Sequence, residues 1–203
     1  YTDAYVYSTG SRVGGIVGRM HNTTTASVKN CWFNGEVTGT VQYVGGIVGS
    51  FQNGAKTIEH CLNTGKVIST RTSTNPAVGG IVGYVEGGTA GKTHQIKYCL
   101  NAGELIVSGT NRIGSVIGFG NNKPITLTNV YTTNKITLKG TASVGTVSTP
   151  GVGSGSSNVT NAPNVVTFPA DLNTTLSGLN AVESNWQIKN SQLVLTQFAE
   201  YVK

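Results

Sequence analysis

The sequence predicts an all-β fold, a right-handed parallel β-helix (solenoid) of about four to five coils with a C-terminal helix-plus-hairpin cap. A repeated hexapeptide, a composition that favours strands, and columns of matching residues in successive repeats support this prediction. A period of 31–35 residues is typical of stacked repeat units, and three short strands per unit fit one coil. A β-propeller blade has a similar period, but it needs four antiparallel strands and longer alternating runs.

The hexapeptide Val-Gly-Gly-Ile-Val-Gly organises the chain. It occupies residues 13–18, 44–49 and 78–83, with a weaker copy at 113–118 and a faint fifth at 144–149. We expect its fourth position to form the deep core, at Ile16, Ile47, Ile81, Val116 and Val147. The next position ends in Ser148, so we expect that column to be less strictly buried. The two central glycines allow a sharp corner or a close approach of neighbouring backbone.

The composition agrees with a strand-rich fold. The chain has 203 residues, of which 28 are glycine and only 11% are charged, and valine and isoleucine dominate its apolar residues. Such residues favour strands, and Gly, Asn and Ser favour tight turns. The net charge of +6 comes from scattered basic residues, which indicates a mildly basic surface and leaves a polyanion-binding face as the alternative. We expect no nucleic-acid partner, and no apolar run is long enough for a direct membrane span.

A second block of the repeat contains a cysteine column. The block spans residues 28–37, 58–67, 96–105 and 127–136. The aligned residues at its fourth position are Cys31, Cys61, Cys99 and Val130. Because valine can replace cysteine there, the position requires a small buried apolar group rather than a reactive thiol. One column of stacked thiols does not supply tetrahedral ligands, so we predict no metal site, and a disulfide between two of the three cysteines stays open.

The columns after the cysteines define a turn and an outward face. One column is glycine in three copies and asparagine in the fourth, which predicts a left-handed turn. Its members are Gly35, Gly65, Gly103 and Asn134. The next column alternates in charge, through Glu36, Lys66, Glu104 and Lys135. Like charges at one strand spacing would repel, so the alternation indicates register control on an outward face.

The chain changes character near its C-terminus, and we expect two parts. Repeats would fill residues 1–149, and a linker with a capping element would fill residues 150–203. Residues 170–182 carry leucines at helical spacing, and two short apolar segments after them flank a turn, which indicates a hairpin. An open β-helix end exposes apolar core and unpaired strand edges, so we expect the helix and hairpin to cover that end.

The hexapeptide followed by a Cys-x-Asn-x-Gly-x-Val pattern resembles the GLUG-motif repeat of large bacterial surface proteins, including adhesin-like and IgA-protease-type chains. The resemblance covers roughly residues 10–149. It implies an extracellular β-solenoid module that is attached to the cell surface as part of a longer secreted bacterial protein. It supplies no catalytic residues.

The distribution of carboxylates argues against an enzyme. Many β-helices cleave polysaccharides, and that chemistry requires clustered carboxylates. This chain has only two aspartates, Asp3 and Asp171, at opposite ends. Glu36 and Glu104 share a column, but Lys66 between them would hold both ionised and so remove the proton donor. A polysaccharide-degrading enzyme is therefore a remote alternative, and we predict no catalytic residue, no cofactor and no metal.

Binding is the function that the sequence favours. We expect a non-catalytic module for adhesion, with host or environmental glycans or surface proteins as its partners. The third unit has long loops at residues 69–77 and 85–95, and insertions in a solenoid often form its binding face. The aromatic and basic candidates in or near these loops are Arg71, Tyr84, Lys92, His94 and Arg112. A passive stalk that spaces a distal domain from the cell surface is the alternative.

Overall fold

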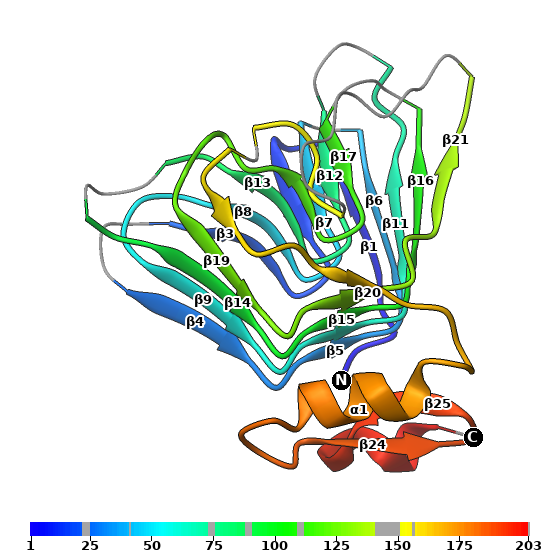
Figure 1. Cartoon of the computed structure of the whole chain (residues 1–203). Helices are drawn as coiled ribbons and strands as arrows, with labels where there is room; N and C mark the ends of the chain where they lie inside the picture. The colour runs from blue at the N-terminus through cyan, green and yellow to red at the C-terminus, as the bar shows by residue number, and fades with distance from the viewer. Residues whose placement is uncertain are drawn as a thin grey trace.

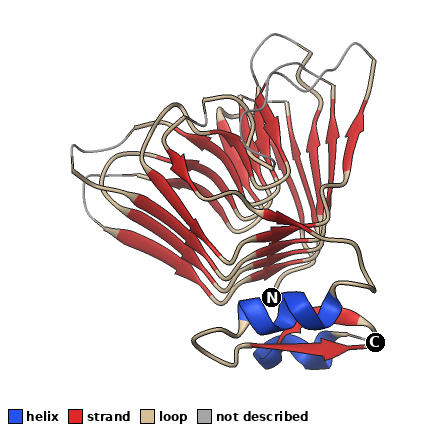
Figure 2. Ribbon diagram, viewed as in Figure 1, coloured by secondary structure: helices blue, strands red, loops and turns tan. Residues whose placement is uncertain are grey.

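The chain forms a parallel β-solenoid of about four turns, followed by a short helix and a hairpin (Figures 1 and 2). The structure is a computed structural model that describes residues 1–21, 25–40, 42–72, 76–87, 91–108, 112–140, 151–155 and 157–202. The predicted fold class is therefore confirmed. The faint fifth hexapeptide at residues 144–149 lies outside the described residues.

Each coil contributes one strand to each of five parallel sheets, which we number I to V in chain order. Sheet I contains β1 (Tyr5–Ser8), β6 (Glu36–Gly39), β11 (Lys66–Ser69), β16 (Glu104–Val107) and β21 (Ile136–Leu138). Sheet II contains β2 (Arg12–Gly14), β7 (Tyr43–Gly45), β12 (Ala77–Gly79) and β17 (Arg112–Gly114). Sheet III contains β3 (Val17–Met20), β8 (Val48–Phe51), β13 (Val82–Val85) and β18 (Ile117–Phe119).

The remaining two sheets complete the coil. Sheet IV contains β4 (Ala26–Lys29), β9 (Lys56–Glu59), β14 (His94–Lys97), β19 (Ile125–Thr128) and β22 (Val159–Thr160). Sheet V contains β5 (Trp32–Phe33), β10 (Leu62–Asn63), β15 (Leu100–Asn101), β20 (Tyr131–Thr132) and β23 (Asn164–Val165). Residues that are equivalent in sequence pair in these ladders, for example Lys66 with both Glu36 and Glu104.

The hexapeptide is the point where the chain folds back between sheets II and III. A Cβ atom built on Gly45 would lie 1.9 Å from the carbonyl oxygen of Val48, so the two strands approach more closely than a side chain allows. The aliphatic residues of the hexapeptide fill the core. Both columns of the hexapeptide are fully buried in the second and third coils, because Ile47, Val48, Ile81 and Val82 are each 0% exposed. The expectation that the second column is less buried was wrong.

The left-handed corner of each coil lies five residues before the predicted one. Positive φ values occur one residue before the cysteine position, at Asn30, His60, Tyr98 and Asn129. Asn134 does have a φ of 53°, but the glycines in its column are not in the left-handed region. Glycine is needed there for a different reason, since a Cβ on Gly65 would lie 2.3 Å from the carbonyl oxygen of Gly35 in the neighbouring coil.

The solenoid continues beyond the predicted boundary at residue 149. Ile117 pairs with Val152, and the Gly153 N–H donates to the Ile117 carbonyl at 2.8 Å, so Val152 rather than Ser148 takes this position in the fifth coil. Strands β22 and β23 then extend sheets IV and V. The segment predicted as a linker therefore begins a fifth coil, which runs to Val165.

The C-terminal segment covers a flank of the solenoid, not its open end (Figure 1). It consists of α1 (Leu172–Leu179), the antiparallel pair β24 (Trp186–Lys189) and β25 (Gln192–Leu195), and a 3-10 helix (Thr196–Tyr201). Its apolar side chains pack against sheet V residues from four successive coils, which are Trp32, Leu62, Leu100 and Tyr131. The predicted helix and hairpin are confirmed, but their apolar faces cover these outward residues because sheet V is apolar on its outer face as well.

The cysteine column lies in the core, at the corner between sheets IV and V. Cys31 is half-buried, Cys61 and Cys99 are buried, and all three are free thiols. The Cys61 N–H donates to the Cys99 Sγ at 3.4 Å. Burial, together with the neighbouring Cys99 thiol, raises the pKa of the Cys61 thiol well above its usual value, so the reactive thiolate is disfavoured.

Candidate functional site

The five predicted ligand-binding residues do not form one site. Tyr84 and Arg112 lie on a common strip of the surface, described below. Among the described residues, no hydrogen bond, ion pair or ring contact joins Arg71 or Lys92 to that strip. His94 is fully buried.

His94 is a core residue, which corrects its prediction as a ligand-binding residue. Its Nδ1 accepts the Lys56 N–H at 3.2 Å, so its Nε2 carries the proton and donates to the Gly87 carbonyl at 3.0 Å. Its ring also contacts Phe51 at a centroid distance of 5.3 Å. Burial lowers the pKa of His94, and burial likewise lowers the pKa of His60.

These two histidines predict a loss of stability in mild acid. The unfolded chain takes up protons on histidine near pH ~6.5, whereas the folded chain resists protonation of His94 and His60. The unfolded state therefore binds more protons in this window, and the free energy of unfolding should decrease as the pH falls from about 7.5 to about 5.5. Urea denaturation at several pH values would measure the slope. His94→Gln should reduce the slope, and the same change at the exposed His21 should not.

An arginine–aromatic strip runs along the outer side of the hexapeptide fold. It consists of Arg12, Tyr43, Tyr84, Phe119 and Arg112. The Tyr43 and Tyr84 rings stack at 4.1 Å with an interplanar angle of 8°, and Tyr84 stacks on Phe119 at 5.3 Å. Arginines lie at both ends, with the Arg112 guanidinium 3.9 Å from the Phe119 centroid and that of Arg12 5.4 Å from the Tyr43 centroid. The strip therefore connects all four full coils.

Glu86 anchors the N-terminal end of this strip. Its carboxylate accepts two hydrogen bonds from Arg12, one of them at 2.6 Å from Nη2, and one from the Ser50 hydroxyl at 2.7 Å. Arg19 lies 3.6 Å away. Burial opposes ionisation of Glu86, but these donors and the two positive charges outweigh it and lower the pKa of the carboxyl group. The cluster ties the third coil to the first and the second.

Glu86→Gln should destabilise the fold by about 2 kcal/mol, because Arg12 would lose its charged partner in a half-buried setting. The lowered pKa of Glu86 also predicts that its contribution is present above pH ~4.3 and disappears as the pH falls through the folded-state pKa. The stability difference between variant and parent should therefore shrink in strong acid. Thermal unfolding across this range tests both points, with the exposed Glu200→Gln as the matched control.

The geometry of the strip suits support between coils better than ligand stacking. Sugars stack on open ring faces, whereas Tyr84 has one face against Tyr43 and the other against Phe119. The exposed aromatics with no ring partner among the described residues are Tyr5 and Tyr7, at 65% and 55% exposure on β1. A glycan-binding role for Tyr84 through its ring face therefore has no support in this geometry.

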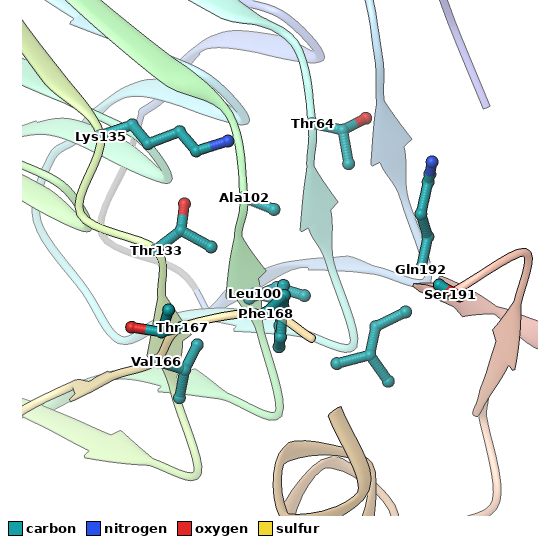
Figure 3. Close-up of a pocket in the computed structure, with 11 residues that line it drawn as sticks. Thr64, Leu100, Ala102, Thr133, Lys135, Val166, Thr167, Phe168, Ser191 and Gln192 are labelled. Carbon is teal, nitrogen blue, oxygen red and sulfur yellow. The ribbon is translucent and has the colours of Figure 1, made fainter. Parts of the chain in front are cut away.

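A pocket of about 420 Å³ lies between the solenoid and the C-terminal segment (Figure 3). Its walls come from the ends of strands in sheet V, from the crossing at residues 166–168, and from the hairpin turn and β25. Its lining combines apolar side chains with hydroxyl groups, and Lys135 is its charged residue among those described. The lining residues are Thr64, Leu100, Ala102, Thr133, Lys135, Val166, Thr167, Phe168, Ser191, Gln192 and Leu193. Its volume lies within the range of ~300–1,000 Å³ for small-molecule sites.

The two carboxylates that the sequence offered for acid–base chemistry, Glu36 and Glu104, are hydrogen-bonded to threonine side chains. Glu36 accepts a hydrogen bond from Thr38 at 3.2 Å, and Glu104 accepts one from Thr137 at 2.6 Å. Lys66 pairs with both in the ladder, although no ion pair joins it to either one. No cluster of His, Cys, Asp and Glu suited to a metal ion occurs in the described part of the chain.

A ladder of alternating charges that does form ion pairs occurs instead on sheet IV. Glu59 lies between Lys29, at 2.7 Å, and Lys97, at 3.2 Å, in a ladder through three coils. Lysine donors lower the pKa of Glu59, with Lys29 contributing most. The same repeat alignment contains this alternation two strands earlier than the glutamate and lysine column that the sequence singled out.

Sequence reasoning missed most of the strip and the whole pocket. Arg12, Tyr43 and Arg112 share the position just before the hexapeptide, and Tyr84 and Phe119 share the position just after it. These recurring aromatic and arginine residues on either side of the hexapeptide could have been recognised in the sequence. Glu86 and the pocket had no local signal, because both depend on contacts between distant segments.

Fold and site together define a parallel β-solenoid repeat module with a pocket on its flank. No protein-family model matches the chain, so the GLUG resemblance stays a prediction. Halomucin from Haloquadratum walsbyi is 35% identical over 116 residues. That match covers 55% of this chain and 1% of halomucin, so the chain spans a very small part of this relative.

A solved structure supports the fold. A crystal structure from Bacteroides ovatus, described as a candidate immunoglobulin A1 protease, matches with a TM-score of 0.69 and 21% identity. The match covers 97% of this chain and 56% of that chain. At this identity the likeness shows the fold alone. Within the described residues, no helix is long and apolar enough to cross a membrane.

Proposed function

We propose that this chain is a non-catalytic binding module of a longer, extracellular, surface-attached protein, with glycans as its ligands. The resemblance of the repeat to the GLUG motif supports the extracellular setting, and the match to a small part of halomucin supports a role as one module among many. The observation that carries the proposal is the pocket between sheet V and the C-terminal hairpin.

The lining of this pocket fits a short saccharide. A sugar presents hydroxyl groups at its rim and C–H groups on its ring faces. Thr167, Ser191 and Gln192 supply exposed hydrogen-bonding groups, and Phe168 and Leu193 supply apolar surface. Figure 3 shows Thr133 and Lys135 on one side and Ser191 and Gln192 on the other, so a ligand would contact both the solenoid and the hairpin.

The same lining supports a non-catalytic role. The pocket contains no carboxylate, histidine or cysteine among its described lining residues, so it offers no acid–base pair for glycosidic cleavage. Glu36 and Glu104 remain the alternative pair. Turnover of a polysaccharide that is abolished by Glu104→Gln would overturn this part of the proposal.

Binding can be tested with a panel of neutral and acidic mono- and disaccharides, followed by NMR chemical-shift changes. We expect at least one panel member to shift resonances from residues 166–168 and 191–193. Ala102→Trp would fill the pocket and should abolish these shifts, and Gln192→Trp would fill it from the opposite wall if the first variant folds poorly. Ala181→Trp, at an exposed position outside the pocket, is the control and should bind as the parent does.

A passive spacer is the second candidate, and the arginine–aromatic strip favours it. The strip and the Glu59 ladder tie successive coils together, as a stiff stalk requires. If no panel member binds and the pocket variants behave as the parent does, the spacer would be preferred. Spin labels at the two ends of the solenoid should then give one narrow distance distribution.

A further inference from the structure

We propose that the pocket selects saccharides that carry a carboxylate, and that Lys135 is the residue that recognises this group. This inference rests on the proposed function, because it names the chemical class of ligand for the same pocket. It is motivated by the single charge among the described lining residues, which are otherwise neutral.

Lys135 is positioned to serve an incoming anion. It lies just before β21 and is exposed, and it reaches over Thr133 at one side of the pocket (Figure 3). Among the described residues no ion pair engages its ammonium group. The neighbouring coil does place Glu104 beside it in the ladder, but no ion pair joins these two side chains, and the Glu104 carboxylate instead accepts a hydrogen bond from the Thr137 hydroxyl at 2.6 Å. The Lys135 charge is therefore available to a ligand.

The rest of the pocket determines where the carboxylate would lie. Leu100, Val166 and Leu193 form a buried apolar floor, which disfavours a charged group there. The carboxylate must therefore lie at the open rim beside Lys135, with the sugar ring between Phe168 and the hairpin. A neutral sugar could occupy the same volume, but it would leave the ammonium group without a charged partner.

The net positive charge of the chain also favours an anionic ligand. A net charge of +6 attracts anionic ligands at long range, and salt screens this attraction. The preference for an acidic saccharide should therefore weaken as the ionic strength increases. Hydrogen bonds from Ser191 and Gln192 would be affected little, so binding of a neutral sugar should be nearly independent of salt.

Glucuronic acid and glucose form a matched pair of probes, because they differ only in a carboxylate in place of a hydroxymethyl group. We expect the parent protein to bind glucuronic acid roughly five-fold more tightly than glucose at low salt. Lys135→Gln should reduce that ratio to about one. Lys139→Gln, the same change at an exposed lysine outside the pocket, should leave the ratio unchanged.

The outcomes separate this inference from the proposed function. Equal binding of the two sugars by the parent, abolished by Ala102→Trp, would retain the binding function and overturn the role of Lys135. A preference for glucuronic acid that survives Lys135→Gln would also overturn it. Absence of binding by either sugar, and by the wider panel, would overturn the proposed function itself. Matching thermal unfolding of Lys135→Gln and the parent would show that the change in the ratio is not caused by misfolding.

Discussion

Gly45→Ala should lower the free energy of unfolding by about 4 kcal/mol or more, enough to prevent folding if the parent is marginally stable. The added Cβ would lie 1.9 Å from the Val48 carbonyl oxygen and 2.8 Å from the Gly83 nitrogen. Both are backbone atoms of strands held on two sides by ladder hydrogen bonds, so neither can move without disrupting neighbouring coils. The expected result is a variant with little cooperative unfolding in circular dichroism.

Gly10→Ala provides the matched control for that experiment. Gly10 is exposed, and a Cβ there would have only the Ser8 hydroxyl within reach, at 3.4 Å. Its effect should stay within about 1 kcal/mol of the parent. Gly79→Ala should behave as Gly45→Ala does, because its Cβ would lie 2.0 Å from the Val82 carbonyl oxygen. A Gly45→Ala variant as stable as the Gly10→Ala variant would show that sheets II and III can separate, contrary to the structure.

The repeat explains why the fold could be predicted from sequence. In a solenoid, equivalent positions of successive coils pair directly, so a sequence alignment is also an alignment in space. The inward Val37 and Val67 and the outward Glu36 and Lys66 could therefore be assigned without a structure.

The wrong predictions concern the left-handed corner and the fifth coil. At the corner, the error arose because glycine can serve more than one structural purpose. Glycine at Gly65 suggested a left-handed turn, but it is required by the close approach of the neighbouring coil. The true left-handed corner contains Asn30 and Asn129, which favour that conformation, but the same column also contains Tyr98, so no single residue type marked the corner in the alignment. In the fifth coil the hexapeptide has decayed so far that the sequence alignment assigned Ser148 to the position of Ile117, whereas the ladder uses Val152.

The pocket could not have been predicted, because its walls meet only after the C-terminal segment has docked. Thr64 and Gln192 are separated by most of the chain, and neither belongs to a motif. The segment itself was predicted as a helix and hairpin, but nothing in its sequence indicated which surface it would cover. The apolar outer residues of sheet V, among them Leu62 and Leu100, were the signal of that surface.

Trp186→Ala should remove about 3–5 kcal/mol from the docking of the C-terminal segment. Trp186 is 3% exposed and lies in the same apolar cluster as Leu62 and Leu100 of sheet V. Its backbone is also fixed, since its N–H and carbonyl both bond the Asn180 side chain at 2.9 Å. The indole Nε1, however, is buried without a hydrogen-bond partner among the described residues. Trp186→Phe removes that donor and should therefore cost less, about 1–2 kcal/mol.

Loss of the segment should be local, because the solenoid has its own separate core. Hydrogen exchange in Trp186→Ala should accelerate in α1 and β24 while sheets I to III remain protected. The uncovered sheet V residues would form an apolar stripe across four coils, so the variant should bind a hydrophobic dye and aggregate. Val182→Ala, at a side chain that is 70% exposed, should change neither property. Uniform acceleration of exchange throughout Trp186→Ala would instead mean that the C-terminal segment and the solenoid unfold as one cooperative unit.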